Sequence, residues 1–272
     1  MKRALFLVLL IALSAESGMA QVTTRSDGNE SKDETPGKKG KILVIPCRPT
    51  MFNAESDVSR GISQETGQNY NQIQEAFRRG TADQFRSAFG GKYQVTTLLD
   101  DTVKMKKDLE YVYNVSALEY IPVNAPLNPA PAAKQDPKKN PQQKGGIKNG
   151  QVATDSDEIE KFMNVNILSP NTLGYLKSKY GCDYVVFVNQ FDLKNDLGSD
   201  PYNVQGKTDF LRSVTIHYTV WSTATEKRVL MGKLSAQFPS SSNNTKKIIA
   251  GPVNSVIRAL FSRFEGVVSA KK

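Results

Sequence analysis

The stretch 184–188 is apolar at every position, with no alternation between apolar and polar side chains. Both faces of such a strand must be covered, which is typical of an inner strand of a parallel sheet. The helix before it is expected to begin at Ser169-Pro170, with serine as the cap and proline at the first helical position, and to end at Gly181. This pattern predicts a central strand preceded by a helix, as in an α/β layer protein.

The first half of the chain predicts a β-α-β unit. Residues 41–46 form a short apolar run ended by proline, and residues 93–99 form a second run rich in β-branched side chains. Between them, residues 70–89 carry their large apolar side chains on one helical face, and Gly80 leaves open whether they form one kinked helix or two. A loop is expected over residues 51–61. The crossover between the two strands should be right-handed.

The second half predicts a hairpin and a final helix. Residues 212–221 alternate between apolar and polar side chains, and residues 230–238 are expected to form the returning strand. The core face carries Val214, Ile216, Tyr218 and Val220, and the other face carries Thr215, His217 and Thr219. A polar loop is expected over residues 194–209. Gly251-Pro252 is expected to begin the last helix, which has a broad apolar stripe.

Two segments give ambiguous patterns. Residues 102–123 fit either an alternating strand or a helix, and residues 157–165 favour a short helix. The order of the remaining elements predicts an α/β fold with a three-layer-like mixed sheet, built as β-α-β-α-β followed by a β-hairpin and a C-terminal helix. Residues 41–268 are expected to form a single domain that carries one insertion.

The first twenty residues have the organisation of an export signal. Lys2 and Arg3 precede an apolar segment, and residues 18–20 place small side chains at the cleavage positions. The apolar segment is shorter than the roughly 20 residues that span a bilayer, so we expect cleavage and no transmembrane helix afterwards. A lipoprotein would need a cysteine directly after the cleavage site, whereas the chain has only Cys47 and Cys182. The sequence therefore predicts an exported protein that is periplasmic or outer-membrane-associated, and not a lipoprotein.

Two polar segments are expected to lack a fold of their own. Residues 21–40 contain almost no apolar side chains and suit a flexible tether, and residues 124–150 form a basic insertion rich in proline and glycine. The formal net charge of the chain is +9. Exported proteins rarely meet nucleic acid, so we expect the insertion to contact an anionic surface instead. Its lysines are Lys134, Lys138, Lys139, Lys144 and Lys148.

The two cysteines are not expected to form a disulfide. Cys47 follows the first strand and Cys182 precedes the central one. If these strands are parallel neighbours, the thiols lie at opposite ends of the sheet, whereas a disulfide needs Cα atoms within about 7 Å of each other.

Three segments resemble exported bacterial envelope proteins of the CsgG, LpoB and TolB N-terminal-domain type. They are the opening KILVIPCRP, the segment LKSKYGCDYVVFVNQFDL, and the hairpin VTIHYTVWSTATEKRVLMGKLSAQF. In that group a helix ends in the pattern G-A-D-Y-V-V-x-G, which is matched here by Gly181, Asp183, Tyr184, Val185 and Val186. Cys182 stands in place of the usual alanine. The resemblance covers about residues 41–99 and 169–268, and it implies a non-catalytic domain that docks other envelope proteins.

The chain departs from that group in two ways. It lacks the lipid-bearing cysteine that is common there. The insertion over residues 102–160 also lacks the paired alternating strands by which CsgG itself enters the outer membrane, so a pore is not expected.

Candidate ligand-binding residues follow the strands of the predicted sheet. Ligands of α/β sheets usually bind beyond the carboxyl ends of the parallel strands. The residues expected there are Cys47, Arg48, Asn53, Asp100, Asp101 and Asp192. An arginine beside carboxylates can bind a polar ligand, but ordinary loop polarity explains the same residues.

The sequence contains no complete catalytic or metal-binding constellation. His217 is the only histidine, and we expect it to be a solvent-facing or packed residue of the sheet, not part of a catalytic triad or a zinc site. Asp192, Asp196 and Asp200 do not have the spacing of an EF-hand, so a solvated turn is favoured over a calcium site. No cofactor is expected.

Aromatic residues supply the candidate partner-binding positions. Trp221 and the group Tyr111, Tyr113 and Tyr120 could anchor a partner, because aromatic side chains are enriched at interfaces, although core packing is the alternative. The leading hypothesis is a non-enzymatic adaptor or assembly accessory factor that docks another envelope protein. The alternative is a periplasmic protein that binds a small or nucleotide-like ligand at the carboxyl ends of the parallel strands.

Overall fold

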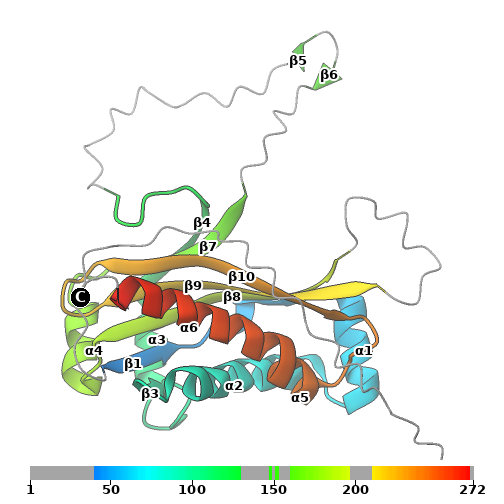
Figure 1. Ribbon diagram of the computed structural model, residues 1–272, viewed down its shortest axis with the longest axis horizontal. Helices are drawn as coiled ribbons and strands as arrows, with labels where there is room; N and C mark the ends of the chain where they lie inside the picture. Colours follow the sequence, from blue (N-terminus) through cyan, green and yellow to red (C-terminus); the bar gives the residue numbers. More distant parts are fainter. Residues whose placement is uncertain (1–39, 130–146, 149–150, 153–159, 197–209, 270–272) are drawn as a thin grey trace, which may run out of the picture.

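The computed structural model describes residues 40–129, 147–148, 151–152, 160–196 and 210–269 (Figure 1). The predicted export signal, nearly all of the predicted tether and four of the five lysines of the basic insertion lie outside these ranges. Within the described residues, no helix is both long and apolar enough to cross a bilayer.

The main sheet is mixed, as predicted from the sequence. Its strands run in the order β10-β9-β8-β1-β3, and the short β2 also pairs with β8. The strands are β1 (Lys41–Ile45), β2 (Phe52–Ala54), β3 (Gln94–Thr97), β8 (Tyr184–Asp196), β9 (Leu211–Ser222) and β10 (Arg228–Pro239). Strand β1 lies parallel to both β3 and β8, whereas β8, β9 and β10 are antiparallel. The first strand and the central strand are therefore parallel neighbours, as we expected.

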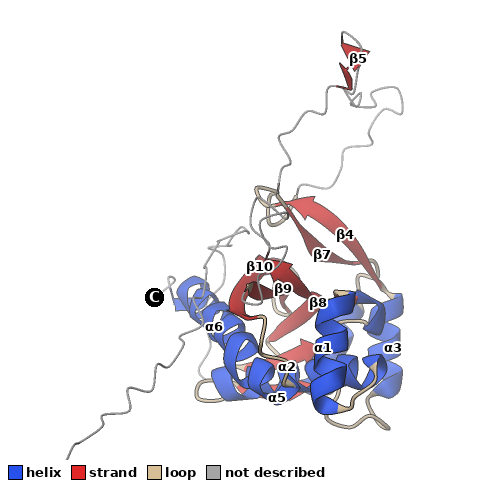
Figure 2. Cartoon of the chain, turned by 90° about the vertical axis from the view of Figure 1, so that its right-hand side faces the viewer, coloured by secondary structure: helices blue, strands red, loops and turns tan. Residues whose placement is uncertain are grey.

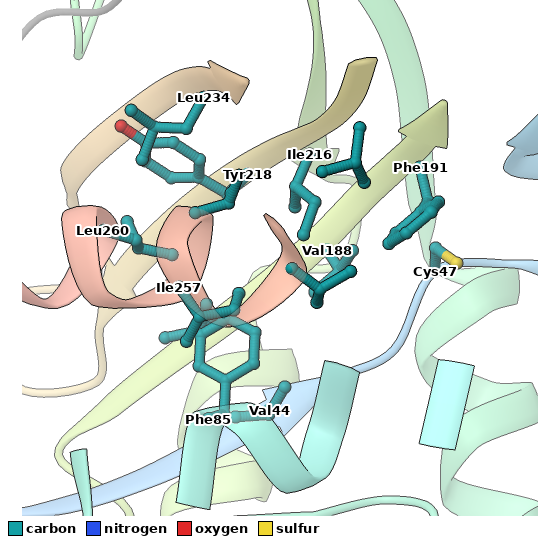
Figure 3. Close-up of a cluster of buried hydrophobic side chains, with 14 of the residues drawn as sticks. Val44, Cys47, Phe85, Val188, Phe191, Ile216, Tyr218, Leu234, Ile257 and Leu260 are labelled. Carbon is teal, nitrogen blue, oxygen red and sulfur yellow. The ribbon is translucent and has the colours of Figure 1, made fainter. Parts of the chain in front are cut away.

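Both faces of β8 are covered over residues 184–188. Tyr184, Val186 and Val188 belong to one buried apolar cluster, and Val185 and Phe187 belong to a second cluster on the opposite face. Helices α2 (Tyr70–Phe89) and α6 (Asn254–Ser269) supply side chains to the first cluster, which Figure 3 shows in part. Helices α3 (Lys106–Asn114) and α4 (Thr172–Tyr180) supply side chains to the second. The predicted inner strand is thus confirmed.

Helix α2 is a single helix that continues through Gly80. A Cβ atom at Gly80 would lie only 2.5 Å from the side chain of Ile249, so glycine is needed for the close approach of the C-terminal helical segment. The loop predicted over residues 51–61 is wrong, because α1 (Ser56–Thr66) begins there and buries Val58 and Ile62. These two side chains are spaced by four residues, which places them on one face of the helix.

The C-terminal helix begins earlier than predicted. Asn244 caps α5 (Thr245–Ile248), and its side-chain oxygen accepts hydrogen bonds from the backbone N–H groups of Lys246 and Lys247. One wide turn of π-helix (Ile249–Val253) then contains Pro252 and leads into α6. Gly251-Pro252 is therefore inside the helical segment and not at its start, because a wide turn accommodates the missing N–H of proline.

Helix α4 ends where the sequence predicted and begins slightly later. Gly181 has φ 64°, a left-handed conformation that favours glycine at a helix C-terminus. The helix begins at Thr172, with Asn171 as the cap position, and not at Ser169-Pro170.

A second pair of strands crosses the sheet, and the sequence did not predict it. Strands β4 (Ser116–Pro122) and β7 (Lys161–Ile167) pair antiparallel, and β7 contacts β8, β9 and β10 (Figure 2). The short helix favoured over residues 157–165 is wrong, because residues 161–165 belong to β7. The ambiguous segment 102–123 contains both a helix, α3, and a strand, β4. The insertion over residues 102–160 also has a paired strand, contrary to expectation.

Part of the predicted unstructured insertion is ordered. Leu127 is buried, and the side chain of Asn128 accepts a hydrogen bond from the backbone N–H of Arg228 and donates one to its carbonyl oxygen. Further along, β5 (Ile147–Lys148) pairs with β6 (Gln151–Val152). The expectation that residues 124–150 lack structure is therefore wrong for residues 124–129 and 147–148.

Candidate functional site

A β-bulge in the central strand creates the polar face of the sheet. The pairing of β8 with β9 skips Asn189, so that Val188 lies opposite Tyr218 and Gln190 lies opposite His217. One extra residue reverses which face each later side chain occupies. Beyond the bulge, Phe191 and Leu193 join the apolar cluster, and the intervening polar side chains turn to the other face.

Asp192 is the centre of a buried polar network on that face. Its carboxylate accepts hydrogen bonds from Asn53 Nδ2 at 2.9 Å and from Gln190 Nε2 at 2.8 Å. His217 Nε2 lies 3.3 Å from Asp192 Oδ2. The hydroxyl of Tyr120 in turn donates to Gln190 Oε1 at 2.7 Å. Four strands, β2, β4, β8 and β9, therefore fix the position of this carboxylate.

The electrostatics of the network keep the aspartate charged. Burial alone would raise the pKa of Asp192, but hydrogen bonds from His217, Asn53 and Gln190 lower it below the ordinary value. Burial lowers the pKa of His217 and outweighs the opposing effect of Asp192. The backbone N–H of Met163 donates to His217 Nδ1 at 2.7 Å, which identifies Nδ1 as the unprotonated nitrogen. The ring is therefore neutral and carries its proton on Nε2.

The network opens onto a cleft of about 610 Å³. Strands β8, β9 and β10 form its floor, and β4 and β7 border it at one end. The floor carries Gln190, Asp192, Lys194, Asn195, Asp196, Ser213, Thr215, His217, Lys233, Ser235 and Gln237, and the border carries Tyr120, Glu160 and Lys161. The cleft is therefore lined almost entirely by side chains that donate or accept hydrogen bonds.

The charges around the cleft balance each other. Glu160 and Lys233 form an ion pair at 2.7 Å, and Lys194 Nζ lies 3.9 Å from Asp192 Oδ2. Asp196 accepts a hydrogen bond from Gln237. The remaining cation in the lining is Lys161, so three carboxylates face three ammonium groups. Among the described residues, the lining of the cleft therefore has no formal net charge.

The structure corrects one of the two positions that we expected for His217. It is not solvent-facing but buried, with 4% of its surface exposed, because β7 and β4 lie over it. The alternation along β9 placed it on the correct face, but no sequence pattern revealed the strand pair that covers it. Both ring nitrogens are engaged, by Met163 and Asp192, so neither is available as a general base.

The structure brings together only two of the six predicted ligand-binding residues, Asn53 and Asp192. Cys47 lies in the apolar cluster, where burial raises the pKa of its thiol to about 12. Arg48 donates to the backbone oxygens of Tyr113 and Ser116.

Asp100 and Asp101 have separate local roles. Asp100 pairs with Arg86 and accepts from the backbone N–H of Thr97. Asp101 accepts from the backbone N–H groups of Val103 and Lys104. Cys47, Arg48, Asp100 and Asp101 therefore lie in four separate environments and do not form the predicted pocket of an arginine among carboxylates.

The strand β8 also continues to Asp196, so Asp192 lies within a strand and the predicted loop over residues 194–209 begins too early.

Three of the four aromatic partner-binding candidates pack internally. Tyr111 contacts the ring of Tyr175 at 5.4 Å between centroids, and Tyr113 donates its hydroxyl proton to Pro46 O at 2.8 Å. The guanidinium of Arg228 lies 5.0 Å from the ring of Trp221. These three residues therefore have the alternative role that we stated for them, which is internal packing. By contrast, Tyr120, the fourth partner-binding candidate, is 54% exposed at the border of the cleft, where we did not expect a site.

Among the described residues, no group of three or more histidine, cysteine, aspartate or glutamate side chains is arranged to hold a metal ion. Asp200, the last of the three aspartates considered for calcium, lies outside the described ranges.

Comparisons with known proteins do not identify the chain. No family model matches it, and no curated protein matches it. Two solved structures of a PelC dodecamer from Paraburkholderia phytofirmans, one of them a point variant, align with 7% and 10% identity and TM-scores of 0.33 and 0.31. Each alignment covers 85% of this chain and 94% of the other. Likeness at this level supports no statement about fold or function, and the resemblance to CsgG, LpoB and TolB stays a prediction.

Proposed function

We propose that this chain is a non-catalytic binding protein that holds a small polar ligand of no net charge in the cleft between β8–β10 and the β4–β7 pair. The observation that carries the proposal is the network around Asp192. Three side chains on three strands hold this buried carboxylate at the cleft floor. A buried polar network destabilises the fold unless every hydrogen bond in it is made. A network in which the bonds are made is rigid, so the cleft floor presents polar groups in fixed positions.

The chemistry of the lining supports this ligand class. Hydroxyl, amide, carboxylate and ammonium groups are mixed across the floor, and Thr215 and Ser235 already form a hydrogen bond of 2.7 Å between their hydroxyl groups. An anion or a cation would meet as many repelling as attracting charges. A neutral or zwitterionic molecule with several donors and acceptors fits best. The exposed ring of Tyr120 adds an apolar face at one side.

The geometry also supports binding without bond making. The histidine at the cleft has both nitrogens engaged, and burial raises the thiol pKa of Cys182 to about 11, as it raises that of Cys47. Thiols with pKa values this high are not nucleophiles at neutral pH.

A thermal-shift screen on the full chain tests the proposal. The probes are zwitterionic amino acids and neutral polyols, compared with nucleoside triphosphates as anions and polyamines as cations. We expect a probe from the first group to raise the Tm, since a ligand at 100 times its Kd adds about 2.7 kcal/mol of stability. Ser235→Trp should abolish this shift, because Ser235 lines the cleft floor and an indole ring would fill the space.

Ser262→Trp is the matched control, because Ser262 is exposed on α6, away from the cleft. It should leave the shift unchanged. A shift produced only by anions or cations, a shift that persists in Ser235→Trp, or no shift with any neutral or zwitterionic probe would contradict the proposal.

Docking of another envelope protein, the leading hypothesis from the sequence, stays a prediction. Three of its four partner anchors, Tyr111, Tyr113 and Trp221, pack internally, and the fourth, Tyr120, is exposed at the border of the cleft. The predicted periplasmic or outer-membrane location likewise rests on the sequence of the first twenty residues.

A further inference from the structure

The β4–β7 pair is held against the main sheet by polar side chains and by the buried apolar side chains of Phe162 and Val165, and not by a backbone ladder. Asn189, the bulge residue, donates from Nδ2 to Met163 O at 2.9 Å. Thr219 donates its hydroxyl proton to Asn164 Oδ1 at 3.0 Å. His217 Nδ1 accepts from Met163 N–H at 2.7 Å. The backbone N–H and C=O of one residue, Met163, are thus both held by side chains of the sheet.

The hydrogen bond to His217 requires a neutral ring. In the imidazolium form both ring nitrogens carry a proton and both are donors. The proton on Nδ1 would then point at the N–H of Met163, so two donors would face each other in a buried site. A buried donor without an acceptor is costly, and the simplest relief is for β7 to move away from the sheet.

We propose that protonation of His217 releases the β4–β7 pair from the main sheet and opens the cleft in mildly acidic conditions. Tyr120, Glu160 and Lys161 border the cleft from this side, so their departure would remove one side of the site and lower its affinity for a ligand. The effect on the ligand rests on the proposed function of the cleft, whereas the release of the strands does not.

The charged and titratable groups around His217 come from every element packed against it. Asp192 on β8 favours the protonated ring, whereas Lys194 on β8 and Lys233 on β10 disfavour it. Tyr120 on β4 packs its ring edge-on against the imidazole. From the side of β7, Glu160 and Lys161 line the same cleft, and Lys233 bonds to both. Imidazole is the side chain whose ordinary pKa, about 6.5, lies in the mildly acidic range, so His217 is the group that this proposal concerns.

The direction of the pH effect follows from the pKa of His217. In the closed structure it lies below the ordinary value of 6.5, with burial as the main cause. In the opened state the ring is solvated and regains that ordinary value. The opened state therefore binds more protons, so closure is fully stable above about pH 6.5 and weakens as the pH falls below it. Asp192 does not contribute in this window, because its pKa is lowered from 3.8.

Hydrogen exchange read by mass spectrometry tests the proposal on the full chain without ligand. The readout is exchange of the backbone amides of residues 161–167, corrected for the intrinsic effect of pH. We expect the corrected rate to rise about tenfold between about pH 7.5 and pH 5.5. The amides of α2 should not change, because that helix covers the opposite face of the sheet.

His217→Asn is the informative variant. Its side-chain oxygen can replace Nδ1 as the acceptor for Met163 N–H and cannot be protonated in this range, so exchange in residues 161–167 should become independent of pH. An equal pH-dependent rise in His217→Asn, or no rise in the original chain, overturns the proposal. If His217→Asn does not fold, NMR titration of the only histidine decides it, since a measured pKa at or above about 6.5 contradicts the release mechanism.

The two proposals can fail separately. Exchange measured without ligand tests the release of the strands alone, and the thermal-shift screen at about pH 7.5 tests binding alone. If both hold, the Kd of the bound probe should rise at the lower pH by the factor by which the closed fraction of the protein falls.

Discussion

At the scale of single residues, Asp192 has the most demanding environment in the site. Donors from β2, β8 and β9 converge on one carboxylate that is 4% exposed. Removing an acceptor from such a network leaves each donor desolvated and unpaired, which costs more than the net value of the hydrogen bonds themselves.

Asp192→Ala should therefore destabilise the protein by about 3 kcal/mol. The loss should be largest at neutral pH and should shrink in acid, because the lowered pKa of Asp192 gives a stabilisation that is present above 3.8 and lost below it. Urea unfolding followed by circular dichroism measures the difference. Asp83→Ala is the control, since Asp83 forms only a surface ion pair with Arg86, and a similar loss in both variants would contradict the role given to Asp192.

The sequence located some of these residues without indicating how they are used. Asp192 and Asn53 were candidates because they follow strands, and they do meet. Gln190 was not a candidate, because an isolated amide has no recognisable pattern, and Tyr120 was a candidate only as a partner anchor. The burial of His217 depends on β7, which is 54 residues from it in the chain. A contact at that separation leaves no local periodicity to detect.

At the scale of the elements, the bulge at Asn189 decides which side chains reach the cleft. The segment Q-F-D-L-K alternates between polar and apolar residues, whereas the preceding Y-V-V-F-V is apolar throughout. Residues 184–188 could therefore lie with either set of side chains toward the core, whether or not an extra residue follows them. Only the extra residue places Phe191 in the core and Asp192 at the cleft.

Deletion of Asn189 should still allow cooperative folding, because Val188 already lies opposite Tyr218 and Gln190 opposite His217, so the deletion removes the unpaired residue and keeps Phe191 in the apolar cluster. Asn189→Ala keeps the register and loses the hydrogen bonds to Met163 and Thr219, so it should cost about 2 kcal/mol and still unfold in one transition. Circular dichroism during urea unfolding measures the midpoint of each variant. A deletion variant that does not fold would show that the pairing of β8 with β9 beyond Asn189 needs the extra residue.

The elements that the sequence predicted are those with strong patterns. The continuous apolar run of β8 and the alternation of β9 were sufficient to place them. Strand β7 was missed because Asn164 and Asn166 interrupt its apolar pattern, and Asn164 is nevertheless completely buried through its bond with Thr219. Helix α1 was missed because only Val58 and Ile62 mark its buried face.

At the scale of the whole molecule, one sheet separates two apolar clusters, and each contains one cysteine. Cys47 belongs to the cluster between the sheet and helices α2 and α6. Cys182 belongs to the cluster between the sheet and helices α3 and α4. Both are free and buried thiols. The sequence predicted that β1 and β8 are neighbours, because both contain continuous apolar runs, but this pairing does not say whether the two layers unfold together.

The two thiols report on this question, because each becomes reactive only when its own layer opens. Burial raises the pKa of both, to about 12 for Cys47 and about 11 for Cys182, so neither should react in the folded protein. If residues 41–268 unfold as one cooperative domain, a thiol reagent in mild denaturant should label both cysteines at rates that agree within about twofold. Peptide mass spectrometry measures each rate, and labelling in strong denaturant gives the intrinsic reactivities for correction. Labelling of Cys182 much faster than Cys47 would mean that the layer of α3 and α4 opens by itself, and the single-domain interpretation would then be wrong.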